Sequence, residues 1–189
     1  MKKSNILIIS IIAVIVIIVV MVIGKYNSIL SQNEQVEAST SNLDVMLQRR
    51  ADLIPNLVNV VKGYVSHEDE VINTVTEARE KLVNSNTVAE KSKANDELTS
   101  ALNNLMVIVE NYPDLKSSAN FTQLSDELAG TENRIAVARR DCNTDIKNYN
   151  LSIKKFPGNL VAGIFGFNEK TYFETDESNK NVPEVNFTK

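Results

Sequence analysis

The chain is poor in the residues that build common catalytic and metal sites. Its 189 residues include one cysteine, one histidine and no tryptophan. One cysteine cannot form an internal disulfide or a thiolate zinc site, and one histidine cannot supply a metal centre that needs two. His67 is followed by Glu68, but no second histidine completes a zinc-binding HExxH helix. We therefore expect no metal, no cofactor and no catalytic residues, and we expect that the chain is not an enzyme.

Positive charge is scarce in most of the chain. There are 20 Lys and Arg residues against 24 Asp and Glu residues. All the acids follow Gly24 and two of the bases precede it, so the part after Gly24 carries 18 bases, 24 acids and a formal charge of −6. Affinity for nucleic-acid phosphates comes from clustered Lys and Arg. This balance argues against a nucleic-acid partner.

The chain begins with a long apolar run. Residues 6–23 are 18 residues of which only Ser10 has a polar side chain. As a helix the run would be about 27 Å long, close to the roughly 30 Å of bilayer hydrocarbon. It is longer than a usual signal-peptide core, and no small-x-small cleavage pattern follows it. We predict an uncleaved membrane anchor over residues 1–24 with a single span at 6–23, in preference to a signal peptide or a buried core helix.

The charges beside this run predict its orientation. Lys2, Lys3 and the amino terminus precede the span, and Lys25 follows it. Because positive charge is retained on the cytoplasmic side, we expect a single-pass protein of the cell membrane with its N-terminus in the cytoplasm. The C-terminal domain would then lie outside.

Residues 25–156 have the pattern of long amphipathic helices. Only two glycines and two prolines occur between residues 26 and 156, and apolar residues recur at steps of three and four. Thr87, with Glu90 three positions later, is a capping-box pattern, and Pro113 ends the run that follows. The last run predicts a helix from about residue 120 to 156. We predict an all-α fold in which residues 25–156 form an antiparallel four-helix, coiled-coil-like bundle.

Pro55 allows two interpretations. Proline inside a helix removes a hydrogen bond and costs about 3 kcal/mol, but it is tolerated in a first turn. With Asp52 as the N-cap, Pro55 would fall in the first turn of a new helix. We therefore predict a tight reversal between helices at residues 50–55, with a kinked continuous helix as the alternative.

The chain changes character after Phe156. Residues 157–189 hold three of the six glycines and four of the six phenylalanines. Disordered tails are poor in aromatic residues, so we predict an irregular aromatic tail that packs on the bundle. For residues 160–167, LVAGIFGF, a flap covering the end of the bundle is favoured over insertion into the membrane interface.

Two arginine pairs, Arg49–Arg50 and Arg139–Arg140, are the candidate contact residues. Adjacent helical residues point about 100° apart, so one arginine of each pair should reach solvent and the other should border the apolar seam. Glu132 or Asp145 in the same helix, or Glu110 across the bundle, could pair with an arginine. Intramolecular ion pairing is favoured. The alternative is that these charges set the register between protomers of an assembly; the residues are Arg49, Arg50, Asp52, Arg139, Arg140 and Asp141.

Several strings resemble the LemA family of bacterial membrane proteins. They are QRRADLIPNLVNVVKGYVSHE at 48–68, TEAR at 76–79, NYPDLKSSANFTQLSDELAGTENRIAVARRDCN at 111–143, NYN at 148–150, FPGNLVAGIFGF at 156–167, YF at 172–173 and VPEVNF at 182–187. The resemblance implies a single N-terminal membrane helix followed by an antiparallel helical bundle. It also implies an accessory role in the cell envelope, beside membrane proteases or envelope-stress proteins. One departure is Cys142, where the family usually has tyrosine.

These observations favour a non-enzymatic, membrane-anchored scaffold that self-associates or recruits a membrane protein. One alternative is an enzyme or small-ligand binder with a site between bundle helices, since bundles host such sites. A further alternative is a helical polymer that shapes the membrane, although the −6 charge of the part after Gly24 gives little attraction to anionic lipid.

Overall fold

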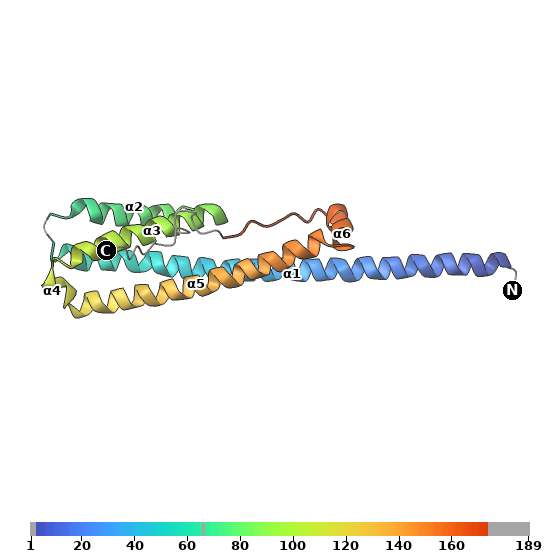
Figure 1. Ribbon diagram of the computed structural model, residues 1–189, viewed down its shortest axis with the longest axis horizontal. Coiled ribbons are helices and arrows are strands. Elements are labelled where there is room, and N and C mark those ends of the chain that lie inside the picture. Colours follow the sequence, from blue (N-terminus) through green and yellow to red (C-terminus); the bar gives the residue numbers. More distant parts are fainter. Residues whose placement is uncertain (1–2, 66, 174–189) are drawn as a thin grey trace, which may run out of the picture. The chain divides into compact units, whose positions relative to one another are not determined.

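A computed structural model describes residues 3–65 and 67–173, and every regular element in these ranges is a helix (Figure 1). The prediction of an all-α fold is therefore confirmed for this part of the chain. The helices are α1 (Lys3–Lys62), α2 (Asp69–Val83), α3 (Val88–Val109), α4 (Pro113–Lys116), α5 (Ala119–Lys154) and α6 (Gly158–Phe165).

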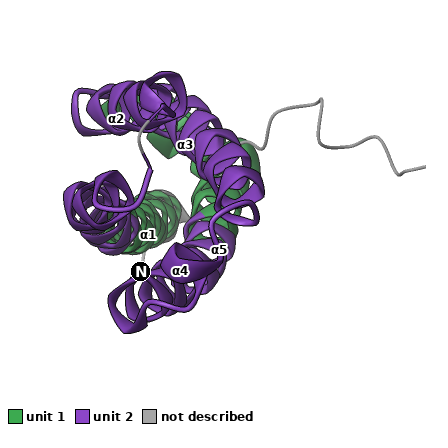
Figure 2. Cartoon of the chain, turned by 90° about the vertical axis from the view of Figure 1, so that its left-hand side faces the viewer, with its two compact units in different colours: residues 1–40, 143–170 green, residues 41–142, 171–189 purple. Residues whose placement is uncertain are grey.

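The chain divides into two compact units (Figure 2). Unit 1 contains residues 1–40 and 143–170, and unit 2 contains residues 41–142 and 171–189. Helices α1 and α5 each contribute residues to both units. Residues 174–189, the end of the predicted aromatic tail, lie outside the described ranges.

Helix α1 continues through Pro55, so the predicted reversal at residues 50–55 is wrong and the continuous helix is right. Proline has no N–H to donate to the carbonyl four residues earlier, which here belongs to Ala51. That carbonyl instead accepts a hydrogen bond of 2.9 Å from Nε of Arg79 in α2. The donor lost at Pro55 is thus replaced from another helix, and α1 runs on to Lys62.

The signals for α3 act as predicted. The Thr87 side chain accepts from the backbone N–H of Glu90 at 3.2 Å, and the Glu90 carboxylate accepts from the backbone N–H of Thr87 at 3.0 Å. This capping box satisfies N–H groups that have no partner inside a helix. Helix α3 ends at Val109, and Pro113 then occupies the first turn of α4.

The apolar residues at three-and-four spacing form the core of unit 2. Cys142, on the seam of α5, is fully buried and so occupies the place expected of a small apolar residue. The other buried residues include Leu43, Leu47, Ile54 and Leu57 from α1, Ile72, Val75 and Leu82 from α2, Leu98, Ala101 and Leu105 from α3, and Leu128, Ile135 and Ala138 from α5.

Unit 1 contains the apolar run. Among the described residues one helix, α1, is long and apolar enough to cross a membrane, and none of its most apolar window is buried. Every large apolar side chain described from Leu7 to Val20 is about half exposed or more. A contiguous exposed apolar surface of this kind is typical of a segment that contacts a membrane or another protein.

The prediction of irregular structure after Phe156 is wrong for Gly158–Phe165, which form α6. Gly158 allows this helix to start against the end of α5, because a Cβ there would lie 1.9 Å from the backbone oxygen of Ser152. Gly166 ends α6 with a left-handed φ of 77°, as a glycine C-cap does. The residues from Gly166 to Phe173 contain no helix or strand.

Candidate functional site

Among the described residues of unit 2, the most buried charge is the guanidinium of Arg50, on α1. Arg50 is 3% exposed. Its Nη1 donates to Oδ1 of Asn95 at 2.6 Å and to Oγ1 of Thr99 at 3.0 Å, both on α3. The same nitrogen lies 2.8 Å from Oε2 of Glu132 on α5, whose side chain is 40% exposed. One arginine thus ties three helices together.

A second arginine lies in the same region. Nη2 of Arg139, on α5, is 3.5 Å from Oδ1 of Asp96 on α3, and both side chains are mostly buried. The guanidinium carbon of Arg139 stands 4.9 Å from the ring centroid of Phe173, which is 2% exposed. A cation over an aromatic face is attracted by the ring, and more strongly where water is excluded. We call the set formed by Arg50, Asn95, Asp96, Thr99, Glu132 and Arg139 the Arg50 cluster.

Two guanidinium groups and two carboxylates balance the charge of the Arg50 cluster. Burial lowers the pKa of the Arg50 guanidinium below its usual value, and the nearby charge of Arg139 lowers it further. Glu132 and Asp96 oppose this shift. Arginine is protonated in proteins, so the cluster holds a charged and largely desolvated cation. A buried cation is stable only when its partners lie beside it. The Arg50 cluster therefore fixes the positions of α1, α3 and α5 along one another within unit 2.

The structure separates the predicted contact residues into buried and exposed ones. In each pair one arginine enters the Arg50 cluster, and the other, Arg49 or Arg140, is exposed. Arg140 contacts its exposed neighbour Asp141 at 3.2 Å. Asp52 is exposed and accepts from the side chain of Gln48 at 2.8 Å. A contact of these surface residues with another protomer stays a prediction.

The pairing partners differ from those expected. Glu132 was expected to pair with an arginine of its own helix, but it lies beside Arg50 of α1. Glu110 forms an exposed ion pair with Lys116 at 2.6 Å. An ion pair between two helices that are far apart in the sequence depends on how these helices are positioned along one another. The spacing of residues along one helix does not predict such a pair.

Sequence reasoning missed the α3 side of the Arg50 cluster. A signal is present in the sequence, because Ser92, Asn95 and Thr99 recur at steps of three and four among the buried apolar residues of α3. Polar residues at the spacing of a buried stripe need partners in the core. Asn95 itself is fully buried.

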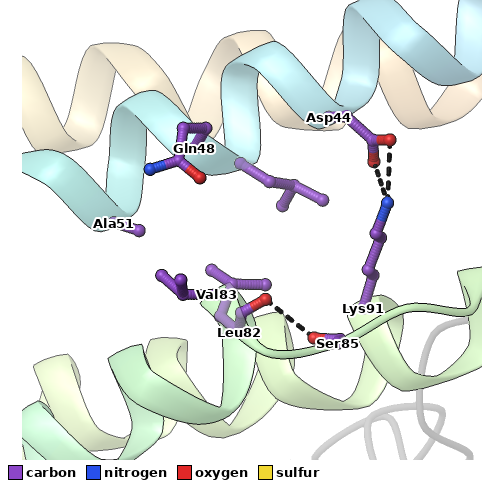
Figure 3. A pocket seen from close by; sticks show the side chains of 8 residues that line it. Asp44, Gln48, Ala51, Leu82, Val83, Ser85 and Lys91 are labelled. Atoms are coloured by element: carbon purple, nitrogen blue, oxygen red, sulfur yellow. Dashed lines mark hydrogen bonds and ion pairs between the residues drawn. The ribbon is translucent and has the colours of Figure 1, made fainter.

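A pocket in unit 2 lies between α1 and the turn that joins α2 to α3 (Figure 3). Its volume is about 150 Å³, and Gln48, Leu82 and Ser85 are among its lining residues. Lys91 closes one side with its ammonium 2.8 Å from both carboxylate oxygens of Asp44. Ligand pockets usually measure about 300 Å³ or more. This pocket is too small for such a ligand.

A larger hollow of about 680 Å³ lies over α5 and includes Arg49. Its other charged residues are Asp126, Glu127 and Arg134. Its volume falls within the range of ligand pockets. Exposed Arg49 is therefore a predicted contact residue that lines a hollow of this size.

Candidate metal ligands do not cluster in the described ranges. Residues 3–65 and 67–173 contain no group of three or more His, Cys, Asp or Glu side chains placed to hold a metal ion. His67 is exposed in the segment before α2.

Comparison with known proteins identifies the family. The LemA family model matches residues 39–187. The chain is 28% identical over 176 residues to magnetosome protein MamQ 2 of Paramagnetospirillum magneticum, covering 79% of this chain and 65% of that protein. It is 26% identical over 159 residues to protein LemA of Metamycoplasma hominis, covering 82% of this chain and 71% of that protein. The chain thus spans slightly less than two thirds of its MamQ relative, and it belongs to the LemA family.

Proposed function

We propose that this protein is a non-enzymatic scaffold, held in the bacterial cell membrane by residues 6–23. In this proposal residues 25–156 form an antiparallel four-helix bundle of coiled-coil type that binds further copies of the chain or a membrane protein. An envelope-stress protease is one such partner that the family resemblance suggests.

The observation that carries the proposal is that α1 contains both the apolar run and Arg50. The same helix presents an exposed apolar run and, further along, the buried Arg50 with its partners on α3 and α5. Membrane attachment and helix pairing therefore depend on one element. The charged side chains of the Arg50 cluster hold each other, and this favours a role in fixing helix positions over a role in chemistry.

Surface features of unit 2 support a binding role. Val45, Val107 and Val137 are each about half exposed or more, on α1, α3 and α5 respectively. The exposed cations Arg49 and Arg140 add charge to the surface. Arginine is enriched in protein interfaces and among the residues that contribute most to binding.

Crosslinking in native membranes with mass spectrometry tests the proposal. We expect crosslinks between copies, or to one membrane protein, at surface lysines such as Lys93 and Lys147, which are exposed. Arg49→Glu and Arg140→Glu should weaken these crosslinks. The matched control is Lys62→Glu, which changes another exposed cation of α1. Crosslinks confined to single chains in native membranes would contradict the scaffold.

The hollow beside Arg49 supports one other candidate function, the binding of a small anionic ligand. Arg49 and Arg134 supply its two cations. If this is the function, Arg49→Ala and Arg134→Ala should abolish activity in cells while crosslinking and thermal stability stay unchanged. Loss of crosslinks together with activity would favour the scaffold.

A further inference from the structure

Helix α6 has an apolar face that the rest of unit 1 does not cover. Leu160 is 56% exposed and Ile164 73% exposed, and they share one face because they are four residues apart. Phe156, just before the helix, is 77% exposed. The opposite face is packed, since Val161 and Ala162 are 2% and 6% exposed. One face of α6 is therefore covered, and the other is exposed.

Contacts within unit 1 place α6 beside the end of the apolar run of α1. The ring of Tyr26 lies 4.8 Å from that of Phe165 and 5.7 Å from that of Phe167, between centroids. At the other end of α6, a Cβ on Gly158 would lie 3.0 Å from Cε of Lys25. Both ends of α6 thus lie close to the two residues of α1 that follow Gly24.

The chain after α6 is also fastened within unit 1. The Tyr149 hydroxyl donates to the backbone oxygen of Asn168 at 3.0 Å. The side-chain amide of Asn150 donates to the backbone oxygen of Lys170 at 2.9 Å and accepts from its N–H at 2.9 Å. Lys154 forms an ion pair with Glu169. These bonds hold the segment after α6 against α5, so the position of α6 beside Tyr26 is fixed from both sides.

This position corresponds to the depth of lipid headgroups. If residues 6–23 fill the hydrocarbon, Tyr26 lies three residues beyond Ile23, or about 4.5 Å along the helix axis. The headgroup layer on each side of the hydrocarbon is about 5 to 7 Å thick. A helix that touches Tyr26 therefore lies in this layer. Exposed Lys155 and half-buried Lys25 are the adjacent cations, and lysines are common where a helix meets headgroups.

We propose that α6 is an interfacial helix whose face formed by Leu160 and Ile164, together with exposed Phe156 just before the helix, enters the bilayer that residues 6–23 cross. The occupant of this face is lipid, at the boundary between headgroups and acyl chains, because the face lies where the span leaves the hydrocarbon. This inference rests on the proposed membrane anchorage and adds a second membrane contact to it. The chain would then be fixed to the membrane at two places, the span and α6.

The absence of tryptophan makes the inference directly measurable. Ile164→Trp and, separately, Leu160→Trp give full-length chains with one tryptophan each, reconstituted in phosphatidylcholine–phosphatidylglycerol vesicles. Each is titrated with acrylamide, which quenches from water, and compared in vesicles of lipids brominated near the headgroup end of the acyl chain. Val107→Trp is the matched control, because Val107 is 69% exposed on α3 of unit 2.

We expect blue-shifted emission from Trp at 164 and at 160, strong quenching by brominated lipid and weak quenching by acrylamide. The Val107→Trp control should show the reverse. Quenching of both α6 variants by acrylamide alone would place the face in water and overturn the inference. Protection from both quenchers would place it against protein and would overturn it equally.

The membrane anchorage is measured on the same samples by flotation after alkaline treatment. A chain that fails to float with the vesicles contradicts the proposed function itself. A chain that floats but shows no quenching by brominated lipid at positions 160 and 164 contradicts only the interfacial helix. Circular dichroism of each variant shows whether it has kept its helices, and two positions on one face guard against a single variant that misfolds.

Discussion

At the scale of the residue, the contact between Arg79 and Ala51 has the largest consequence for how α1 is built. Ala51 is 1% exposed, so its carbonyl is out of reach of water. Pro55 cannot donate to it, and Nε of Arg79 does so at 2.9 Å. A buried carbonyl without a donor costs about 1–3 kcal/mol. Arg79 therefore makes a proline tolerable in the middle of a helix.

This relation predicts coupling between the two residues. Arg79→Met should lower the free energy of unfolding by about 1–3 kcal/mol, because it leaves the Ala51 carbonyl without a donor. Pro55→Ala restores an N–H at position 55, so the same Arg79→Met change should cost less in that background. Thermal unfolding of the four detergent-solubilised chains, followed by circular dichroism, measures the difference. Equal losses in both backgrounds would mean that Arg79 stabilises the protein in some other way.

The ion pair of Arg50 and Glu132 should matter more than the exposed pair of Arg140 and Asp141. Removing one partner of a buried ion pair costs about 3–5 kcal/mol, and partial exposure of Glu132 reduces this. We expect Glu132→Ala to lower the free energy of unfolding by about 2 kcal/mol, whereas Asp141→Ala should change it by less than about 0.5 kcal/mol. Chemical denaturation of both variants gives the comparison. Similar values for the two would show that burial adds nothing to the Arg50 pair.

At the scale of the element, the start of α3 should respond to acid. Hydrogen bonds from the backbone of Asn86 and Thr87 lower the pKa of Glu90 below its usual 4.5. A carboxyl whose pKa is lower in the folded chain stabilises the fold above the unfolded pKa, and this contribution is lost as the pH falls through the folded pKa.

Glu90→Gln removes the charge and keeps an oxygen that can accept from the backbone. The wild-type chain should therefore unfold at a higher temperature than Glu90→Gln near pH 7, and the gap should close as the pH falls below about 4.5. Melting temperatures of both chains between pH 7 and pH 3 provide the measurement. The control is Glu80→Gln, at an exposed glutamate of α2. A gap that is unchanged at pH 3 would exclude a charge effect at this N-terminus.

Two glycines of α6, Gly158 and Gly163, provide a matched pair of substitutions that tests how closely α6 packs against α5. A Cβ at Gly158 would lie 1.9 Å from a backbone oxygen, whereas a Cβ at Gly163 has no atom within 4 Å. Gly158→Ala should therefore displace α6 and lower the melting temperature. Gly163→Ala should be neutral or stabilise by about 0.5–1 kcal/mol, because alanine favours a helix. Melting curves and proteolysis near residue 157 report both effects. A harmless Gly158→Ala would mean that α5 and α6 do not approach this closely.

The elements differ in how far their sequence predicts them. Helices α3 and α5 follow from local signals, a capping box at Thr87 and a long stripe at three-and-four spacing. The passage of α1 through Pro55 does not, because the compensating donor, Arg79, lies on another helix. Helix α6 was missed for a different reason. Its glycines indicate irregular structure, but Gly158 serves close packing and Gly166 serves the C-cap.

The same distinction holds for the candidate site. Burial of one arginine in each pair follows from the 100° step of a helix. The identity of the partners does not, because Asn95, Thr99 and Glu132 reach Arg50 from helices that the spacing of residues along α1 says nothing about. Sequence reasoning therefore located the charged residues and left their pairing open.

At the scale of the whole molecule, the apolar run of α1 and its flanking charges predict on which side of a membrane the part after residue 24 lies. Lys2, Lys3 and the amino terminus stand before the run, and Lys25 stands after it. This small excess favours a cytoplasmic N-terminus. The acidic part after Gly24 has little effect on the choice, since Asp and Glu contribute weakly to orientation. The part of the chain after residue 24 would then lie on the outer side of the membrane.

Protease added to intact cells or spheroplasts should therefore cleave the part after residue 24 and leave the N-terminus protected. Because the excess is small, replacing Lys2 and Lys3 by Gln should produce a mixed orientation, with part of the chain resistant until the membrane is broken. The matched control replaces Lys62 and Lys93, exposed lysines of unit 2, by Gln and should keep one orientation. An epitope placed at each end and a cytoplasmic marker protein report the cleavage. Digestion that occurs only after lysis would place unit 2 in the cytoplasm and reverse the predicted topology.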